Sequence, residues 1–62
     1  MPIIEVKAFE PRFEDEDKAR QLIEALTDAL VSVYGEGSRA ETWVVLQGVA
    51  PSRWGFGGKL RV

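Results

Sequence analysis

The chain of 62 residues contains no cysteine and no histidine, and these two absences limit how it can become stable. A domain of this length buries only about 60% of the surface that its unfolded chain exposes, so its own core is marginal. Small domains usually compensate with disulfides, a bound metal or oligomerisation. Without cysteine there is no disulfide or thiolate metal site, and without histidine the commonest metal ligand is missing. Oligomerisation is therefore the expected means of stabilisation.

Composition narrows the class of protein further. Hydrophobic residues make up 45% of the chain, which favours a folded domain over a disordered tail. The net charge is −2 and the basic residues are scattered, so the chain lacks an electrostatic footprint for nucleic acid. No apolar run reaches the ~20 residues that cross a bilayer, and a signal-peptide pattern is missing. We expect one cytoplasmic domain over residues 1–62, without nucleic-acid or membrane partners.

Two stretches of the sequence predict β-strands. Residues 2–9 alternate in polarity, with the period of a strand that buries one face. Proline at the start of this stretch is compatible with a strand, because no ladder hydrogen bond needs its nitrogen. Residues 41–48 are apolar on both faces, as in a covered sheet. In the first stretch, one face carries Ile4, Val6 and Ala8, and the other carries Glu5 and Lys7 with Ile3 and Phe9.

A long amphipathic helix is predicted between these strands, over residues 14–34, because apolar residues recur there at steps of one, three and four. They are Ala19, Leu22, Ile23, Leu26, Ala29, Leu30 and Val33. The acidic run at residues 14–17 suits the positive end of the helix dipole, and Gly35 and Gly37 are stop signals. The acidic run lacks the spacing and the glycine of a calcium loop, so we interpret it as a solvated helix start.

Strand, helix and strand in this order make one βαβ unit, whose crossover is nearly always right-handed with parallel strands. The expected fold class is α+β, with two parallel strands crossed by one long helix. A single helix covers one face of a two-stranded sheet and leaves the other face open. The open face, with Ile3, Phe9 and part of the Trp43 strand, must meet other subunits, so the unit is expected to assemble into an oligomer.

Pro2 is the first candidate for a catalytic group. As a strand starter it would need no function, and a proline after the initiator methionine is weak support by itself. A small residue after Met1, however, normally permits removal of that methionine, which exposes a secondary amine. The reference pKa of an α-amino group is about 8, and burial or nearby cations lower it. Such an amine accepts protons near neutral pH in a chain without histidine.

Arg12 follows Pro11 in the predicted connection between strand and helix. It is either a solvated loop arginine or a fixed guanidinium that binds a carboxylate through two hydrogen bonds and lowers the basicity of a nearby amine. The glycine-rich segment 53–59 lacks the spacing and the strand-to-helix context of phosphate-binding loops. We interpret residues 54–58 as a flexible aromatic loop that lets Trp54 lean over an apolar pocket.

The opening Pro-Ile-Ile-Glu-Val at residues 2–6, Arg12, and the closing Trp-Gly-Phe-Gly-Gly at residues 54–58 together resemble the 4-oxalocrotonate tautomerase family of the tautomerase superfamily. The resemblance extends over essentially the whole chain. It implies a βαβ subunit that assembles commonly as a hexamer, a trimer of dimers. The implied chemistry is 1,3-proton transfer in enol or dienol 2-oxo acids, without a cofactor or a metal, in the catabolism of aromatic compounds.

The resemblance also implies roles for three residues of this chain. Pro2 takes a proton from the enol hydroxyl of the substrate and returns one to a carbon atom, as a single base near its pKa can do. Arg12 resembles the arginine that binds the substrate carboxylate and draws electron density toward it. Trp54 stands where the family often has an aromatic residue, whose apolar contact keeps the pKa of the amine low.

One position departs from the family pattern. The best-studied members carry a second arginine early in the second strand, which polarises the 2-keto oxygen, and this chain has Trp43 there. Arg39 and Arg53 are the candidates to replace that arginine, by reaching the substrate site of a neighbouring subunit. Without a replacement, stabilisation of charge on the keto oxygen weakens by about 3 kcal/mol.

Three functions remain open from the sequence. The first is tautomerisation of a 2-hydroxydienoate or a related 2-oxo acid by a homohexamer. The second is hydration or dehalogenation of an unsaturated acid by a superfamily relative, which requires a carboxylate placed to activate water. The third is a non-catalytic role, as a subunit of a mixed hexamer or a small-acid binding module. Trp43 favours the third function, and retention of Met1 would favour it more, because Met1 acylates Pro2.

Overall fold

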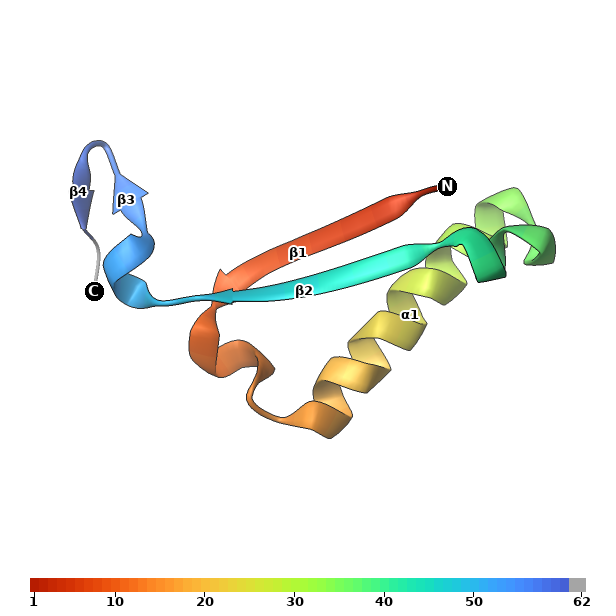
Figure 1. Cartoon of the computed structure of the whole chain (residues 1–62), viewed down its shortest axis with the longest axis horizontal. Helices are drawn as coiled ribbons and strands as arrows, with labels where there is room; N and C mark the ends of the chain where they lie inside the picture. The colour runs from red at the N-terminus through yellow and green to blue at the C-terminus, as the bar shows by residue number, and fades with distance from the viewer. Residues whose placement is uncertain (61–62) are drawn as a thin grey trace.

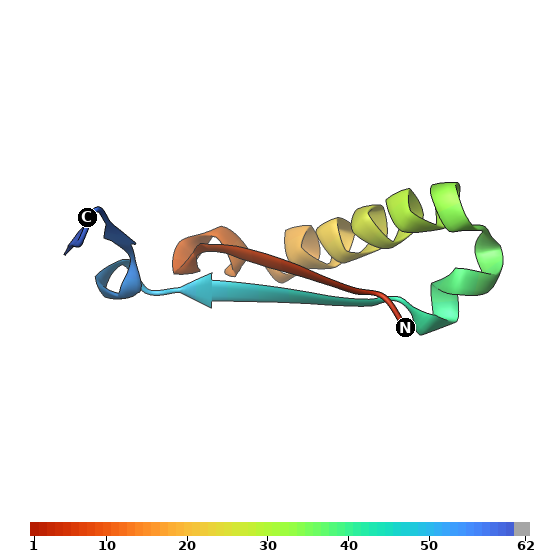
Figure 2. The same cartoon turned by 90° about the horizontal axis from the view of Figure 1, so that it is seen from above.

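The structure, a computed structural model, describes residues 1–60 and has the predicted order of strand, helix and strand (Figure 1). β1 (Ile3–Phe9) is followed by α1 (Glu16–Tyr34) and then by β2 (Trp43–Val49). Viewed from above, α1 lies on one side of the strand layer and leaves the other side open (Figure 2). The chain therefore has the α+β class and the βαβ unit expected from its sequence.

β1 and β2 pair in parallel, from Ile3 opposite Trp43 to Phe9 opposite Val49. Paired residues of neighbouring strands point to the same side, so the two strands share their faces in register. The face toward α1 is half-buried, and it consists of Ile4, Val6 and Ala8 of β1 with Val44 and Leu46 of β2. The alternation predicted for β1 is confirmed, and β2 follows the same alternation although both of its faces are apolar.

α1 begins two residues later than predicted because a side chain caps it there. Asp15 is the N-cap, and its Oδ1 accepts the backbone N–H groups of Asp17 at 3.0 Å and Lys18 at 3.2 Å. These bonds satisfy two of the N–H groups that have no partner within the helix. At the other end, Gly35 stops the helix with φ of 96°, a conformation that glycine adopts without a Cβ clash. In residues 1–60, α1 included, no helix has the length and apolar character to span a bilayer.

Three 3₁₀ turns connect the main elements: η1 (Glu10–Phe13), η2 (Glu36–Glu41) and η3 (Pro51–Arg53). The first and third have a proline in their opening positions, where its fixed φ suits the turn and its missing N–H costs no hydrogen bond. η2 takes up the beginning of the stretch predicted as the second strand. β2 therefore starts at Trp43 rather than at residue 41.

The chain after η3 forms an antiparallel hairpin, and the prediction of a flexible loop over residues 54–58 is wrong. β3 (Gly55–Phe56) pairs with β4 (Lys59–Leu60). The residues between them, Gly57 and Gly58, have φ of 60° and 85°. Positive φ at both central positions is what a type I′ turn requires, and glycine meets it without strain. The two glycines thus form the turn of the hairpin.

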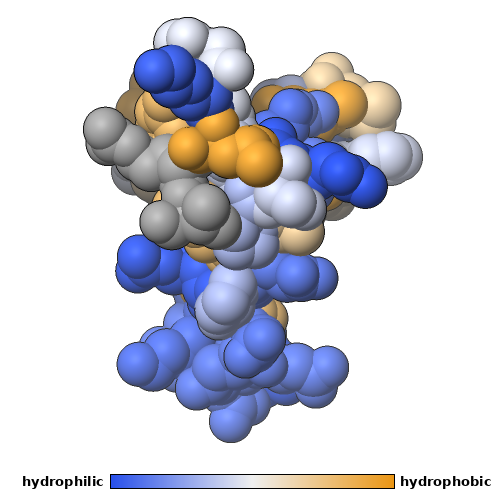
Figure 3. Space-filling view, turned by 90° about the vertical axis from the view of Figure 1, so that its left-hand side faces the viewer, coloured by the Kyte–Doolittle hydropathy of each residue, from blue (hydrophilic) through white to orange (hydrophobic). Residues whose placement is uncertain are grey.

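These elements enclose very little interior. In the part of the chain that the structure describes, no residue is fully buried. On the sheet face away from α1, the residues Ile3, Trp43 and Val45 are 52%, 55% and 47% exposed. At the hairpin end, Figure 3 shows apolar surface among hydrophilic side chains, and Leu60 there is 61% exposed. Large apolar side chains on two surfaces favour burial against another chain.

We expect the protein to form an oligomer, with six chains of 6.9 kDa each as the family resemblance implies. Val45→Lys should lower the mass measured by sedimentation velocity or native mass spectrometry, because a lysine buried between chains loses its hydration. Within one chain the new lysine lies opposite Glu5 in the ladder. This pair of opposite charges should leave the fold of the single chain intact.

Gln21→Lys is the matched control. Gln21 is exposed on α1, so this substitution adds the same charge away from the sheet face. The Gln21→Lys variant should form an oligomer with the same number of chains as the wild-type protein. A well-folded wild-type monomer at micromolar concentration would contradict the argument from the open sheet face.

Candidate functional site

Pro2 lies at the start of the sheet, against the C-terminal end of α1. Its carbonyl accepts the backbone N–H of Trp43 at 3.0 Å, so Pro2 is attached to the first rung of the ladder between β1 and β2. Its nitrogen carries no N–H and makes no ladder bond. Removal of Met1 would therefore expose the amine without breaking any hydrogen bond of the sheet.

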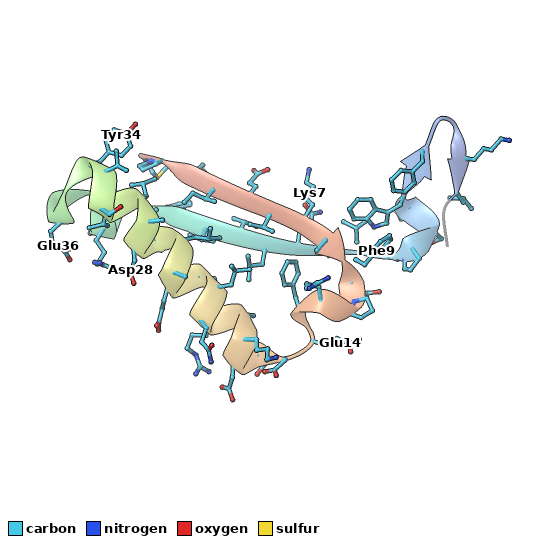
Figure 4. All side chains as sticks on the ribbon, turned by 180° about the vertical axis from the view of Figure 1, so that it is seen from behind. Lys7, Phe9, Glu14, Asp28, Tyr34 and Glu36 are labelled. Carbon is cyan, nitrogen blue, oxygen red and sulfur yellow. The ribbon has the colours of Figure 1, made fainter. Side chains whose placement is uncertain are left out.

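A pocket of about 480 Å³ opens beside Pro2. It is lined by Pro2, Leu30, Tyr34 and Ser38. Figure 4 shows Tyr34 at the end of α1, close to the start of β1. The hydroxyl of Ser38 donates to the carbonyl of Gly35 at 2.7 Å, which leaves the pocket mainly apolar. An apolar wall disfavours a protonated amine, so it would lower the pKa of a free Pro2 nitrogen.

Two of these lining residues, Tyr34 and Ser38, were not predicted from the sequence. Leu30 was assigned to the apolar stripe of the helix, and Tyr34 follows it at the i+4 position, which is the same side of a helix. That spacing could have identified Tyr34. Ser38 gave no such signal, because it lies in η2 and the turn itself was not predicted.

Trp43 is hydrogen-bonded to Pro2 through its backbone N–H, but its side chain belongs to the opposite face of the sheet. It stands opposite Ile3 in the ladder, on the side away from α1. The structure thus brings Trp43 close to Pro2 through the backbone bond without placing the indole among the residues that line the pocket.

Arg39 is engaged by two carboxylates at the same end of the molecule. Its Nε lies 2.6 Å from Oε1 of Glu36, and its NH1 lies 2.9 Å from Oδ1 of Asp28. These hydrogen bonds, first to Glu36 and then to Asp28, raise the pKa of Arg39 further above its ordinary value. Asp28 and Glu36 lie at this end in Figure 4. Arg39 therefore ties η2 to α1, and its guanidinium is already paired with two carboxylates.

Arg12, Arg53 and Trp54 lie at the other end of the sheet, where β1 and β2 terminate. Arg12 is in η1, directly after β1, and Arg53 ends η3, shortly after β2. Both arginines are exposed, and in residues 1–60 neither has an ion-pair partner, whereas Arg20 and Arg39 are both paired. Their guanidinium groups are available to an anion.

Trp54 is fixed in an aromatic cluster. Its Nε1 donates to the carbonyl of Val49 at 3.1 Å, and its ring centroid lies 4.7 Å from that of Phe9. The ring of Phe56 is almost parallel to it, at 13° and a centroid distance of 6.4 Å. Phe9 is visible in this cluster in Figure 4. Within one chain, Trp54 therefore attaches the hairpin to the end of the sheet rather than covering Pro2.

η1 crosses the end of β2 at Gly48. A Cβ at this position would lie 3.0 Å from the Cα of Glu10 and 3.3 Å from its carbonyl oxygen. These are backbone atoms, so they cannot move aside as a flexible side chain would. The absence of a side chain at Gly48 lets η1, and with it Arg12, rest on the sheet.

The predicted site residues thus form two groups at opposite ends of the sheet (Figure 1). β1 has 7 residues, and a strand rises about 3.3 Å per residue, so roughly 23 Å of strand separates Pro2 from η1. This distance exceeds the reach of an arginine side chain. Within one chain, the structure brings Pro2 together with the backbone of Trp43, and it does not bring Pro2 together with Arg12, Arg53 or Trp54.

Comparison with known proteins gives one match. The family model described as Tautomerase enzyme matches residues 2–61, nearly the whole chain. No curated protein and no solved structure matches it. The matched range includes Pro2 and the free arginines, so both ends of the sheet fall within it.

We expect Gly48→Ala to destabilise the protein by about 1–3 kcal/mol, because the new methyl group overpacks against the backbone of Glu10. The measurement is urea unfolding at a fixed protein concentration. Gly37→Ala is the control, since a Cβ there meets no atom within 4 Å. Equal free energies of unfolding for the two variants would mean that η1 moves away at no cost.

Proposed function

The chain belongs to the tautomerase family, and we propose that it is a cofactor-independent tautomerase of the 4-oxalocrotonate tautomerase type. Its substrate would be a 2-hydroxydienoate or a related 2-oxo acid, and its general base would be the amine of Pro2 after removal of Met1. The observation that carries this proposal is the position of Pro2, held at the start of the sheet and lining an apolar pocket of about 480 Å³.

The surroundings of Pro2 suit a general base. An efficient base has a pKa near the working pH. The protonated form of a secondary amine beside Leu30 and Tyr34 is less well hydrated than in water, which would lower the pKa of the amine toward neutrality. The chain has no histidine or cysteine to take this role.

We further propose that each site is shared between chains of an oligomer. The apolar sheet face and the marginal interior of one chain support assembly. The roughly 23 Å between Pro2 and η1 supports a site that takes Pro2 from one chain and Arg12 from another. Arg12, Arg53 and Trp54 share the end where the strands terminate, so one neighbouring chain can supply all three.

The proposed reaction moves one proton between two atoms of the substrate. Arg12 binds the carboxylate through charge-assisted hydrogen bonds and draws electron density toward it. The neutral amine of Pro2 takes the proton of the enol hydroxyl, and the oxygen becomes the 2-keto oxygen as the electrons shift along the conjugated chain. The protonated amine then returns a proton to the carbon that has gained electron density. No net proton enters or leaves the site, and Pro2 is neutral again at the end.

A non-catalytic subunit of a mixed hexamer is the second candidate. Two observations favour it: the second-strand arginine of the family is Trp43 here, and Arg39 is already paired with Asp28 and Glu36. In that case the chain would assemble with an active partner chain and show no turnover as a homo-oligomer.

The first test of the proposed function concerns Pro2 and pH. With a 2-hydroxydienoate as substrate, kcat/KM should rise with pH as the amine loses its proton and should level off above a pKa that lies below about 8. Pro2→Ala should lower kcat/KM sharply without abolishing it, because it supplies a primary amine of different basicity.

The control for this test is a chain with one extra residue before Pro2, which keeps the ring but converts the amine into an amide. Intact mass spectrometry verifies both termini. The extended chain should lose at least about 100-fold in kcat, the lower end of what a general base contributes. Equal rates for the extended and processed chains would refute the role of Pro2.

The second test concerns Arg12. Arg12→Ala should raise KM and reduce kcat/KM by about 1.5–3 kcal/mol of lost charge-assisted contact, with little change in unfolding because the residue is exposed in η1. Arg20→Ala removes an arginine on α1 that is paired with Asp17 and should leave the kinetics unchanged. If Arg12→Ala also left the kinetics unchanged, Arg12 would not bind the carboxylate, and Arg53 would be the next candidate.

A further inference from the structure

The pocket beside Pro2 requires a hydrogen-bond donor if a keto oxygen is to form there. In the tautomerisation proposed above, negative charge develops on the 2-oxygen of the substrate while the proton is on the amine. A positioned donor at such an oxygen is among the largest contributors to catalysis. The residue at the second-strand arginine position, Trp43, is not among the residues that line the pocket.

The donors near Pro2 can be compared one by one. The hydroxyl of Ser38 donates to the carbonyl of Gly35 at 2.7 Å, so its proton is already used. Arg39 is held by Glu36 at 2.6 Å and by Asp28 at 2.9 Å. The nitrogen of Pro2 is the proposed base. Arg39 is also not among the residues that line the pocket, so none of these three residues is placed to donate to the 2-oxygen.

Tyr34 is different. It lines the pocket together with Pro2, and its hydroxyl makes no hydrogen bond to any residue in the range 1–60. Tyr34 as a residue is 76% exposed, and its side chain extends from the end of α1 beside the start of β1 (Figure 4). A phenol is a suitable donor to a developing oxyanion, as in ketosteroid isomerase, where a tyrosine hydroxyl forms part of the oxyanion hole.

We propose that Tyr34 is a further catalytic residue, whose hydroxyl donates a hydrogen bond to the 2-oxygen of the substrate in the pocket beside Pro2. This inference rests on the proposed tautomerase function and adds the group that stabilises charge on the oxygen. Tyr34 transfers no proton; its O–H bond remains intact while Pro2 carries the proton from oxygen to carbon. Arg12, at the other end of the sheet, binds the carboxylate from a neighbouring chain, as in the proposed function.

The kinetic test is Tyr34→Phe, which removes the hydroxyl and keeps the ring that lines the pocket. We expect kcat to fall by about 100-fold with a smaller change in KM, because the lost bond strengthens only as charge develops. Ser32→Ala is the matched control, since it removes a hydroxyl from the same end of α1, where Ser32 donates to the carbonyl of Ala29. A Tyr34→Phe variant within twofold of the wild-type kcat would overturn the proposal.

A second measurement does not depend on turnover. Tyr34 is the one tyrosine of the chain, so growth on 3-fluorotyrosine labels this position alone and gives a single ¹⁹F resonance. Addition of 2-oxopentanoate should shift this resonance, and pentanoate, which has the same carboxylate and tail without the 2-oxygen, should shift it much less. Equal shifts from both acids, or none from either, would overturn the proposal. If the wild type shows no turnover that depends on Pro2, the proposed function fails, and the ¹⁹F comparison still decides whether Tyr34 contacts the 2-oxygen.

Discussion

The parallel pairing of β1 with β2 determines where every candidate site residue lies. One ladder, from Ile3 opposite Trp43 to Phe9 opposite Val49, places Pro2 at one end and the turns that carry Arg12 and Arg53 at the other. Because both strands run in the same direction, their N-terminal ends share one edge of the molecule and their C-terminal ends share the other. The proposed base and the proposed anion-binding arginines are therefore separated in space by the same pairing that orders each of them.

The thin interior of the chain has a simple physical origin. A single helix shields one face of two strands, and the chain is too short to supply a second layer. The face that remains open presents Ile3, Trp43 and Val45 to water. If two chains met antiparallel on this face, one end of a sheet would lie near the opposite end of the other, and the same contacts would stabilise the fold and join the two groups of the proposed site.

The sequence was sufficient to predict the βαβ unit, because its signals are local. The alternation around Val6 and the stop at Gly35 depend on neighbours in the chain, and both were found in the structure. The hairpin turn at Gly57 was missed because two glycines permit either mobility or a tight turn, and the choice depends on the strands around them.

The site was less accessible to prediction, because it depends on contacts between distant parts of the chain. Pro2 was selected on chemical grounds, yet its pocket comes from the far end of α1 and from η2, including Tyr34 and Ser38. The sequence also left open whether Arg39 or Arg53 replaces the missing arginine. In the structure Arg39 is held by two carboxylates, whereas Arg53 has no ion-pair partner within residues 1–60. No pattern in the sequence indicates which of several surface charges will pair in space.

The hydrogen bond from Trp43 to the carbonyl of Pro2 has a consequence for dynamics. The first rung of a ladder is where a sheet opens most readily, at a small fraction of the free energy needed to unfold the whole chain. If Pro2 is the base, each such opening removes it from its pocket while the rest of the molecule remains folded. The temperature range of activity would then follow a local fraying equilibrium at the N-terminus, and the protein would become inactive, reversibly, well before it melts.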